Sequence, residues 1–151
     1  MSDSRTPYQD TSVAVERSMQ QVREGLRAAG ARGIQIEDTW EPPRVLIRFL
    51  WPMGEEGFEQ IVRVRLEVTP LPPEKGARGG WKVSPEQRER QAWRALSWYL
   101  KTMLEAATFG LMRFEEIFLA YVEDEDGRTV GEVVIPQLEA GRLLLPKGGG
   151  S

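Results

Sequence analysis

The chain has 151 residues, of which 40% are hydrophobic and 28% are charged, and its formal net charge is −3. These values are typical of one globular domain with a single core and argue against wholesale disorder. The sequence contains neither cysteine nor histidine, which excludes disulfides, thiolate ligands and cysteine nucleophiles and removes the commonest general base and metal ligand. We therefore expect a reducing compartment, and binding rather than catalysis.

The sequence predicts neither a membrane span nor a signal peptide. No stretch approaches the roughly 18 consecutive apolar residues that a membrane span needs, and the polar start has no apolar core of a signal peptide. The sequence thus predicts a cytoplasmic protein. We expect residues 1–12 to form a flexible arm, residues 13–146 a single α+β domain, and residues 147–151 a flexible glycine-serine linker outside the fold.

The first half of the domain predicts one helix and three strands. Apolar residues recur at helical spacing at Val15, Met19, Val22, Leu26 and Ala29. Gly30 follows, where glycine readily adopts the left-handed conformation that ends a helix. Alternating patterns predict strands over residues 34–40, 44–51 and 61–68, with Pro52 ending the second. Short connections between them favour an antiparallel meander.

The second half is predicted to be mainly helical. Prolines and glycines over residues 69–83 predict a long irregular loop. Ser84, Pro85 and Gln87 then form a strong helix start. The helix runs to about Thr108, and its expected buried stripe is Trp93, Leu96, Leu100, Met103 and Ala107.

Two further segments complete the predicted fold. Helical spacing over residues 111–121 predicts a third, shorter helix. Thr129 and Glu132 match a capping box, so residues 130–140 are either a last helix or, because Pro136 interrupts them, an edge strand. The predicted class is α+β: an N-terminal helix, a three-stranded antiparallel meander, a long helix packed on the sheet and a helical C-terminal tail, with helices on one sheet face.

Several short runs resemble an uncharacterised family of small proteins from tailed phages and prophages. The runs include Arg90-Gln91-Ala92-Trp93-Arg94-Ala95-Leu96, Phe114-Glu115-Glu116, Phe118-Leu119-Ala120 and Asp126-Gly127-Arg128-Thr129-Val130-Gly131. The likeness covers most of residues 13–138, although the middle strands match only in pattern. No activity or site residue follows from this family. The resemblance implies a setting, namely a phage or prophage gene acting in a bacterial cytoplasm.

The order of helix, three strands and helix also resembles the topology of double-stranded RNA-binding domains. Those domains begin the second helix with a lysine-rich phosphate clamp. Here the corresponding turn reads Ser84-Pro85-Glu86-Gln87-Arg88. The resemblance is therefore one of topology alone.

Two groups of acidic residues are candidates for metal or catalytic sites. The turn Glu123-Asp124-Glu125-Asp126-Gly127 invites a calcium interpretation, but aligning Gly127 with the invariant glycine of a calcium loop puts valines where carboxylates are required. A solvated turn is the better interpretation. The other candidates for a carboxylate site are Glu105, Glu115 and Glu116, and no spacing fixes their mutual geometry. We expect no catalytic residue, no metal and no cofactor. A binding protein is therefore a better interpretation of this sequence than an enzyme.

The best candidate site is positive charge gathered on one sheet face. Strand alternation puts Arg44 and Arg48 on the same face as Arg63 and Arg65. On the second helix Arg90, Arg94 and Lys101 share a face, with Trp98 between the last two. The loop residues Arg78 and Trp81 add a cation and a ring for stacking on a base. The alternative is that the arginines pair with glutamates while Leu46, Leu50 and Ile61 pack under the helical tail or a second subunit, and that Trp81 folds onto the core.

Three functions are compatible with these features. The favoured one is a phage-type accessory protein of replication or recombination that binds the backbone of DNA or RNA without catalysis. The alternative is a protein-binding module that inhibits or redirects a host enzyme. A carboxylate-metal hydrolase comes third, because histidine and an ordered acidic motif are missing. The expected partners are thus DNA or RNA, or a host or phage protein, with a homo-oligomer as a further alternative and no membrane.

Overall fold

The computed structural model describes residues 7–142. In chain order its elements are α1 (Pro7–Ala29), β1 (Gly33–Trp40), β2 (Pro43–Met53), β3 (Gln60–Val68), β4 (Glu74–Lys75), β5 (Trp81–Val83), α2 (Pro85–Thr108), α3 (Phe114–Phe118), the 3-10 turn η1 (Leu119–Tyr121) and α4 (Val130–Glu139). The predicted α+β class is confirmed, with β1, β2 and β3 in an antiparallel meander.

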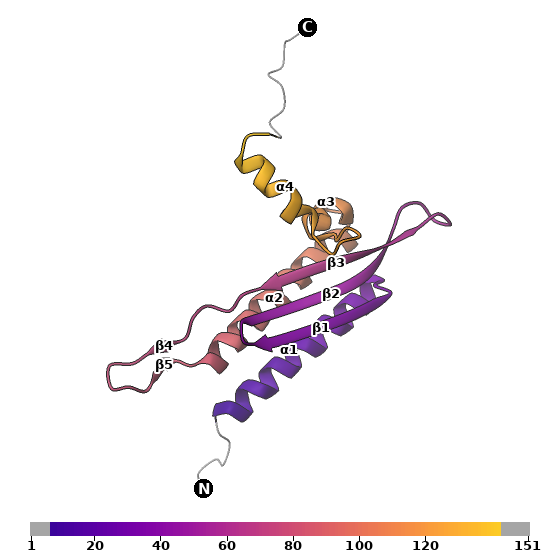
Figure 1. Ribbon diagram of the computed structural model, residues 1–151. Coiled ribbons are helices and arrows are strands. Elements are labelled where there is room, and N and C mark those ends of the chain that lie inside the picture. The colour runs from indigo at the N-terminus through magenta and orange to yellow at the C-terminus, as the bar shows by residue number, and fades with distance from the viewer. Residues whose placement is uncertain (1–6, 143–151) are drawn as a thin grey trace.

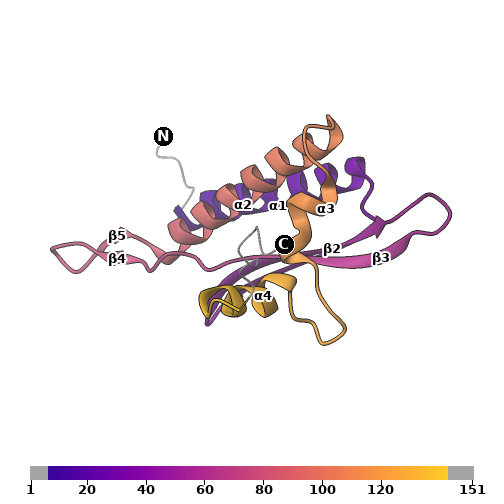
Figure 2. The same ribbon diagram turned by 90° about the horizontal axis from the view of Figure 1, so that it is seen from above.

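The sheet separates two unequal layers of helix. α1 and α2 lie side by side and run in the same direction across one face, which we call the inner face (Figures 1 and 2). α4 lies on the opposite, outer face (Figure 2). The expectation that all helices share one face therefore fails for α4. The chain reaches the outer face because, after η1, Val122 pairs with Val64 at the free edge of β3.

The core fills the space between the inner face and the two long helices. Alternation along β2 turns Val45, Ile47 and Phe49 inward, and all three are fully buried. α1 and α2 contribute the stripes that their spacing predicts, with Leu26 and Trp93 among the buried residues. Phe49 also meets the rings of Phe114 and Phe118 edge-on, and these contacts place α3 against the sheet.

Both predicted capping boxes are formed. Ser84 Oγ accepts from the Gln87 backbone N–H at 3.1 Å, while Gln87 Oε1 accepts from the Ser84 N–H at 2.7 Å. Thr129 and Glu132 make the same reciprocal pair at the start of α4. The segment left open between helix and strand is therefore a helix, since its first amides are satisfied by the cap. Pro136 lies inside this helix.

Several predicted boundaries change. α1 begins at Pro7, so residues 7–12 of the expected arm are helical, while residues 1–6 and the expected linker 147–151 lie outside the described residues. β2 continues through Pro52, which pairs only with β3 because β1 reaches no further than Leu50. At that point β2 is an edge, where a missing amide is tolerated.

Two segments carry different structure from that expected. The loop over residues 69–83 is not irregular throughout, since β4 and β5 pair as a two-stranded ribbon that projects from the body (Figure 1). The third helix is shorter than predicted, because only Phe114–Phe118 is α-helical and η1 continues it. Leu111 precedes the helix and is 76% exposed. The predicted helix therefore included a residue that does not pack against the core.

Candidate functional site

The structure brings the four sheet arginines together on the outer face. Arg48 lies opposite Arg65 in the register between β2 and β3, and Arg63 lies opposite Leu50. Arg44 lies on the same face of β2, four residues before Arg48, with Leu46 between them. The predicted gathering of guanidinium groups is therefore present in space. The main partner of Arg48, Arg63 and Arg65, however, comes from the segment after η1, which strand alternation does not reveal.

Glu123 is the main partner of these arginines. Its side chain is 1% exposed, and its carboxylate lies 2.7 Å from Arg48 Nε, 3.5 Å from Arg65 Nε and 3.7 Å from Arg63 Nε. The Glu123 backbone N–H donates to the carbonyl of Arg63 at 2.8 Å, which fixes the residue beside β3. The acidic turn was expected to be solvated, but the side chain of its first residue, Glu123, is buried and forms ion pairs with three arginines.

The remaining charges on this face are also compensated. Arg44 lies 3.2 Å from Glu37 and 3.8 Å from Glu67. Arg65 additionally binds Glu132 of α4, which joins the outer helix to the sheet. Leu46, on the same face, is 1% exposed. A phosphate backbone would have to displace carboxylates that already satisfy these arginines, so the local field that attracts polyanions is largely cancelled here.

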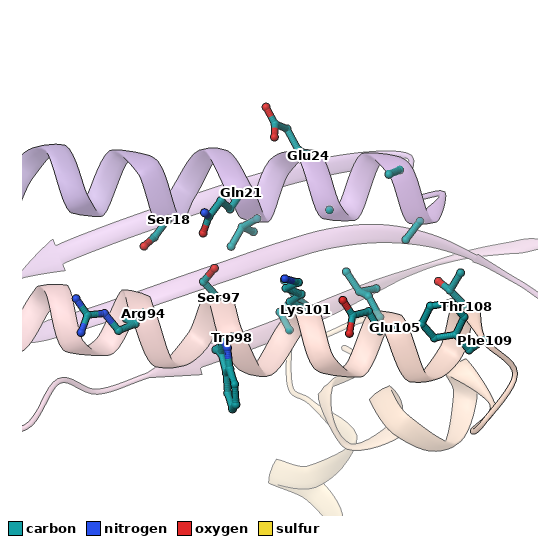
Figure 3. Close-up of a pocket in the computed structure, with 16 residues that line it drawn as sticks. Ser18, Gln21, Glu24, Arg94, Ser97, Trp98, Lys101, Glu105, Thr108 and Phe109 are labelled. Carbon is teal, nitrogen blue, oxygen red and sulfur yellow. The ribbon is translucent and has the colours of Figure 1, made fainter.

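A second set of predicted residues lies on α2, away from the sheet. Arg94, Trp98, Lys101 and Glu105 form one exposed stripe along the helix, which we call the α2 stripe. Trp98 is 74% exposed. Figure 3 shows Trp98 on the side of α2 turned away from α1. Among the described residues, the three charged members make no ion pair.

The α2 stripe borders a groove of about 680 Å³ between α1 and α2. Short side chains open this groove, among them Ser18, Gly25 and Ala28 of α1 and Ser97 of α2 (Figure 3). Arg94 and Lys101 lie toward the N-terminal and central part of its α2 wall, and Glu105 lies toward the C-terminal part. Both signs of charge therefore line the groove.

Apolar surface continues past the C-terminal end of α2. Phe109, Leu111 and Met112 are 73%, 76% and 52% exposed. Clusters of exposed large apolar side chains are more typical of interaction surfaces than of a surface facing only water.

The last two predicted residues lie on the projecting ribbon. Trp81, in β5, is 48% exposed, and the Lys75 ammonium lies 4.1 Å from the centroid of its ring. Trp81 therefore does not fold onto the core, and one face of its ring is covered by a cation. Arg78 occupies the turn between β4 and β5. This turn lies at the tip of the ribbon, which projects beyond the N-terminal end of α2 and away from the α2 stripe (Figure 1).

Sequence reasoning missed a pair of carboxyl groups on the inner face. Asp38 of β1 accepts a 3.3 Å hydrogen bond from the indole N–H of Trp93 through Oδ2, while its Oδ1 is buried without a hydrogen-bond partner among the described residues. Glu89 of α2 adjoins it. Burial, together with the hydrogen bond to Asp38 and the charges of Asp38 and Glu86, raises the pKa of Glu89 to about 7. One proton shared between Asp38 and Glu89 would satisfy Oδ1.

This carboxyl pair borders a second cavity of about 640 Å³. Its walls include Val15 and Met19 of α1, Trp40 at the end of β1 and the prolines that precede β4. The position of Asp38 could have been predicted from the sequence, because alternation along β1 puts it on the same face as Ile34 and Ile36. No spacing in the sequence points to its partner on α2.

The acidic residues form no metal centre within the part of the chain that the structure describes. Asp124 closes the turn by accepting from the backbone N–H groups of Asp126 and Arg128, both at 2.9 Å. The Arg128 N–H bond is the main reason that the pKa of Asp124 is lowered. Glu105 belongs to the α2 stripe, whereas Glu115 pairs with Arg113 on α3.

Comparisons of the chain with protein-family models, with curated proteins and with solved structures gave no match. Among the described helices, none combines the length and the apolar character that crossing a membrane requires.

Proposed function

We propose that the protein is a non-catalytic module that binds another protein through the α2 stripe and the adjoining α1–α2 groove. One observation carries the proposal: Trp98 is 74% exposed on a helix whose neighbouring charges have no partner among the described residues. Tryptophan and arginine are enriched at the centres of protein interfaces, where a few such residues supply most of the binding energy. The sheet face is a weaker candidate because its arginines are already paired.

The mixed charge of the surface favours a protein over a polyanion. Glu105 belongs to the α2 stripe and Glu24 lines the facing wall of the groove. A phosphate backbone approaching Arg94 and Lys101 would meet the Glu105 carboxylate, whereas the Glu24 carboxylate points away from the groove (Figure 3). A protein partner offers charges of both signs and an apolar side chain for Trp98. The resemblance to phage proteins suggests that such a partner is a phage or host protein in a bacterial cytoplasm, and a second copy of the chain is another candidate.

Nucleic-acid binding is the second candidate function. The observation that favours it is the position of Trp98 between Arg94 and Lys101, since single-strand binders stack bases on aromatic rings flanked by cations. Under this hypothesis the protein acts as an accessory factor of replication or recombination, and Arg94→Ala/Lys101→Ala reduces the log-log salt slope by roughly 0.7 for each lost contact with a single strand.

Site-specific photo-crosslinking distinguishes the two functions. A photoreactive phenylalanine replaces Trp98 in one variant and Phe58, which is 80% exposed in the turn between β2 and β3, in the control. After irradiation in bacterial lysate treated with nuclease, we expect protein adducts from position 98 and none of the same mass from position 58.

Fluorescence anisotropy with labelled oligonucleotides completes the test. We expect no binding by the parent at about 50 mM salt, a concentration at which phosphate contacts are strong. Equal adducts at both positions, or no adduct at position 98, would contradict the protein-binding proposal. Oligonucleotide binding that Arg94→Ala/Lys101→Ala abolishes would replace it with the nucleic-acid function.

A further inference from the structure

The α2 stripe is symmetric in its spacing. Arg94 and Glu105 lie equally far, along the sequence, from the midpoint between Tyr99 and Leu100, and so do Trp98 and Lys101. Steps of three and four residues keep all four side chains on one helix face. An exposed cation therefore mirrors an exposed anion, and an exposed aromatic ring mirrors a second cation.

We propose that a second copy of the chain occupies the α2 stripe, with the two α2 helices antiparallel about a two-fold axis between Tyr99 and Leu100. The inference rests on the proposed function, because it names the partner of the same surface. In this arrangement Arg94 faces Glu105 of the second copy, and Trp98 faces Lys101 of the second copy. A two-fold axis repeats every contact, so each pair forms twice.

The opposed side chains fit each other chemically. Arg94 and Glu105 have opposite charges, and the planar guanidinium suits a carboxylate. An ammonium group over an indole ring, as Lys101 would lie over Trp98 of the second copy, is a favourable cation-π contact. The same symmetry continues outward, where Arg90 opposes Phe109, again a cation and an exposed ring. Ala95 and Thr102, both exposed beside the stripe, are short enough for packed helices to approach.

Other arrangements lack this complementarity. If two α2 helices lay parallel in register, Arg94 would meet Arg94 and Glu105 would meet Glu105, which places like charges together. A register shifted by one turn separates Arg94 from Glu105 of the second copy. Only the antiparallel register about the midpoint pairs all four residues of the stripe, and this charge pattern is what selects a second copy over an unrelated partner.

Charge reversal with rescue tests the pairing. We expect sedimentation equilibrium to give twice the mass of the chain for the parent. Arg94→Glu and Glu105→Arg should each weaken the dimer by roughly tenfold in Kd, since each replaces two opposed pairs by two like-charged pairs. The double variant Arg94→Glu/Glu105→Arg restores opposite charges and should recover most of the affinity. Arg23→Glu, an exposed change on α1 outside the groove, is the matched control and should leave Kd unchanged.

Cysteine pairing tests the register. Because the chain has no cysteine, Trp98→Cys and Lys101→Cys each introduce a single thiol. In an oxidised mixture of the two variants, disulfides between position 98 and position 101 should exceed those between identical positions, since disulfides form only at short Cα separations. Circular dichroism confirms that each variant is folded.

Three outcomes would overturn the inference: a monomeric parent at several hundred micromolar, a dimer insensitive to both reversals, or a double variant no tighter than the single ones. A monomer whose position 98 still crosslinks to a different protein would refute the second copy while leaving the proposed function standing. Absence of every adduct at position 98, together with a monomer, would refute both.

Discussion

Arg48 on the central strand donates a 2.7 Å hydrogen bond through Nε to the buried carboxylate of Glu123, which lies 75 residues later in the chain. This pair attaches the segment after η1 to the outer face of the sheet. Arg65 and Arg63 approach the same carboxylate. The arginines that a sequence pattern presents as a binding surface therefore help to hold the C-terminal part of the fold.

Removing Glu123 should destabilise the protein. Glu123→Ala leaves Arg48 and Arg65, which are 25% and 14% exposed, without their common anion. Breaking a buried pair costs about 3 to 5 kcal/mol, and partial exposure of the arginines lowers our expectation to about 2 kcal/mol. Urea denaturation measures the loss. Asp126→Ala, at a side chain that is 78% exposed, is the control, and an equal effect of both changes would show that the clamp contributes nothing.

The triple change Arg48→Ala/Arg63→Ala/Arg65→Ala should also lower the free energy of unfolding. It leaves the Glu123 carboxylate buried without a cation, which is a costly arrangement. Arg94→Ala/Lys101→Ala should be nearly neutral, because neither residue makes an ion pair among the described residues. Thermal melts of the two variants, at a protein concentration low enough to keep the chain monomeric, test the contrast. A triple variant as stable as the parent would mean that the sheet arginines are not structural.

Trp93 and Trp98 should respond oppositely to truncation. Trp93 is fully buried and donates to Asp38, so Trp93→Ala should cost about 3 to 5 kcal/mol. Trp98 is 74% exposed, and Trp98→Ala should change stability by less than about 0.5 kcal/mol. Urea melts at a protein concentration low enough to keep the chain monomeric provide the comparison. A loss under about 1 kcal/mol for Trp93→Ala would contradict the packing of α2.

The start of α2 offers a test of capping. Ser84 accepts the Gln87 N–H at 3.1 Å, and Ser84→Ala should cost about 1 kcal/mol by leaving that amide without its partner. Ser97→Ala, inside the same helix, should be neutral or slightly stabilising because alanine has the higher helix propensity. If the two changes have the same effect on urea melts, the capping box does not stabilise this helix start.

Stability should depend on pH through Glu89. Its pKa is raised from 4.5 to about 7 in the folded protein, so between these values the folded state holds a proton that the unfolded state has released. Stability therefore falls as pH rises from about 4.5 to 7 and levels off above 7. Besides Asp38, the charged groups around this site are Glu16, Glu86 and Arg88.

Glu89→Gln isolates this contribution, because the amide cannot ionise and still donates to Asp38. Glu89 is partly exposed, so we expect the variant to exceed the parent by about 1 kcal/mol at pH 8, after allowing for solvent screening, and to match it near pH 5. Chemical denaturation at the two pH values measures the difference. Glu55→Gln, at an exposed position in the turn between β2 and β3, should show no such pH dependence. A constant difference between parent and Glu89→Gln would exclude the shared proton.

Several elements could be predicted from the sequence because their signals are local. Period-two alternation identified β2 and β3, helical spacing identified the cores of α1 and α2, and Ser84 with Gln87 marked where α2 begins. These features depend on neighbours within one turn or one strand, so single-sequence patterns contain them. The α2 stripe was partly visible for the same reason, because Arg94 and Lys101 share a face whatever lies beyond the helix.

The partners of the charged side chains could not be predicted in this way, because they depend on how distant segments pack together. Glu123 belongs by sequence to an acidic turn, yet its side chain is buried. The preceding residue, Val122, pairs with Val64 of β3, and this contact brings the Glu123 carboxylate to Arg48. Asp38 and Glu89 come together because α2 crosses the inner face at the end of β1. Alternation states which face a residue occupies but not which distant segment covers that face. Coulomb interactions depend on separation in space, and local sequence patterns do not give the distance between two residues that are far apart in the chain.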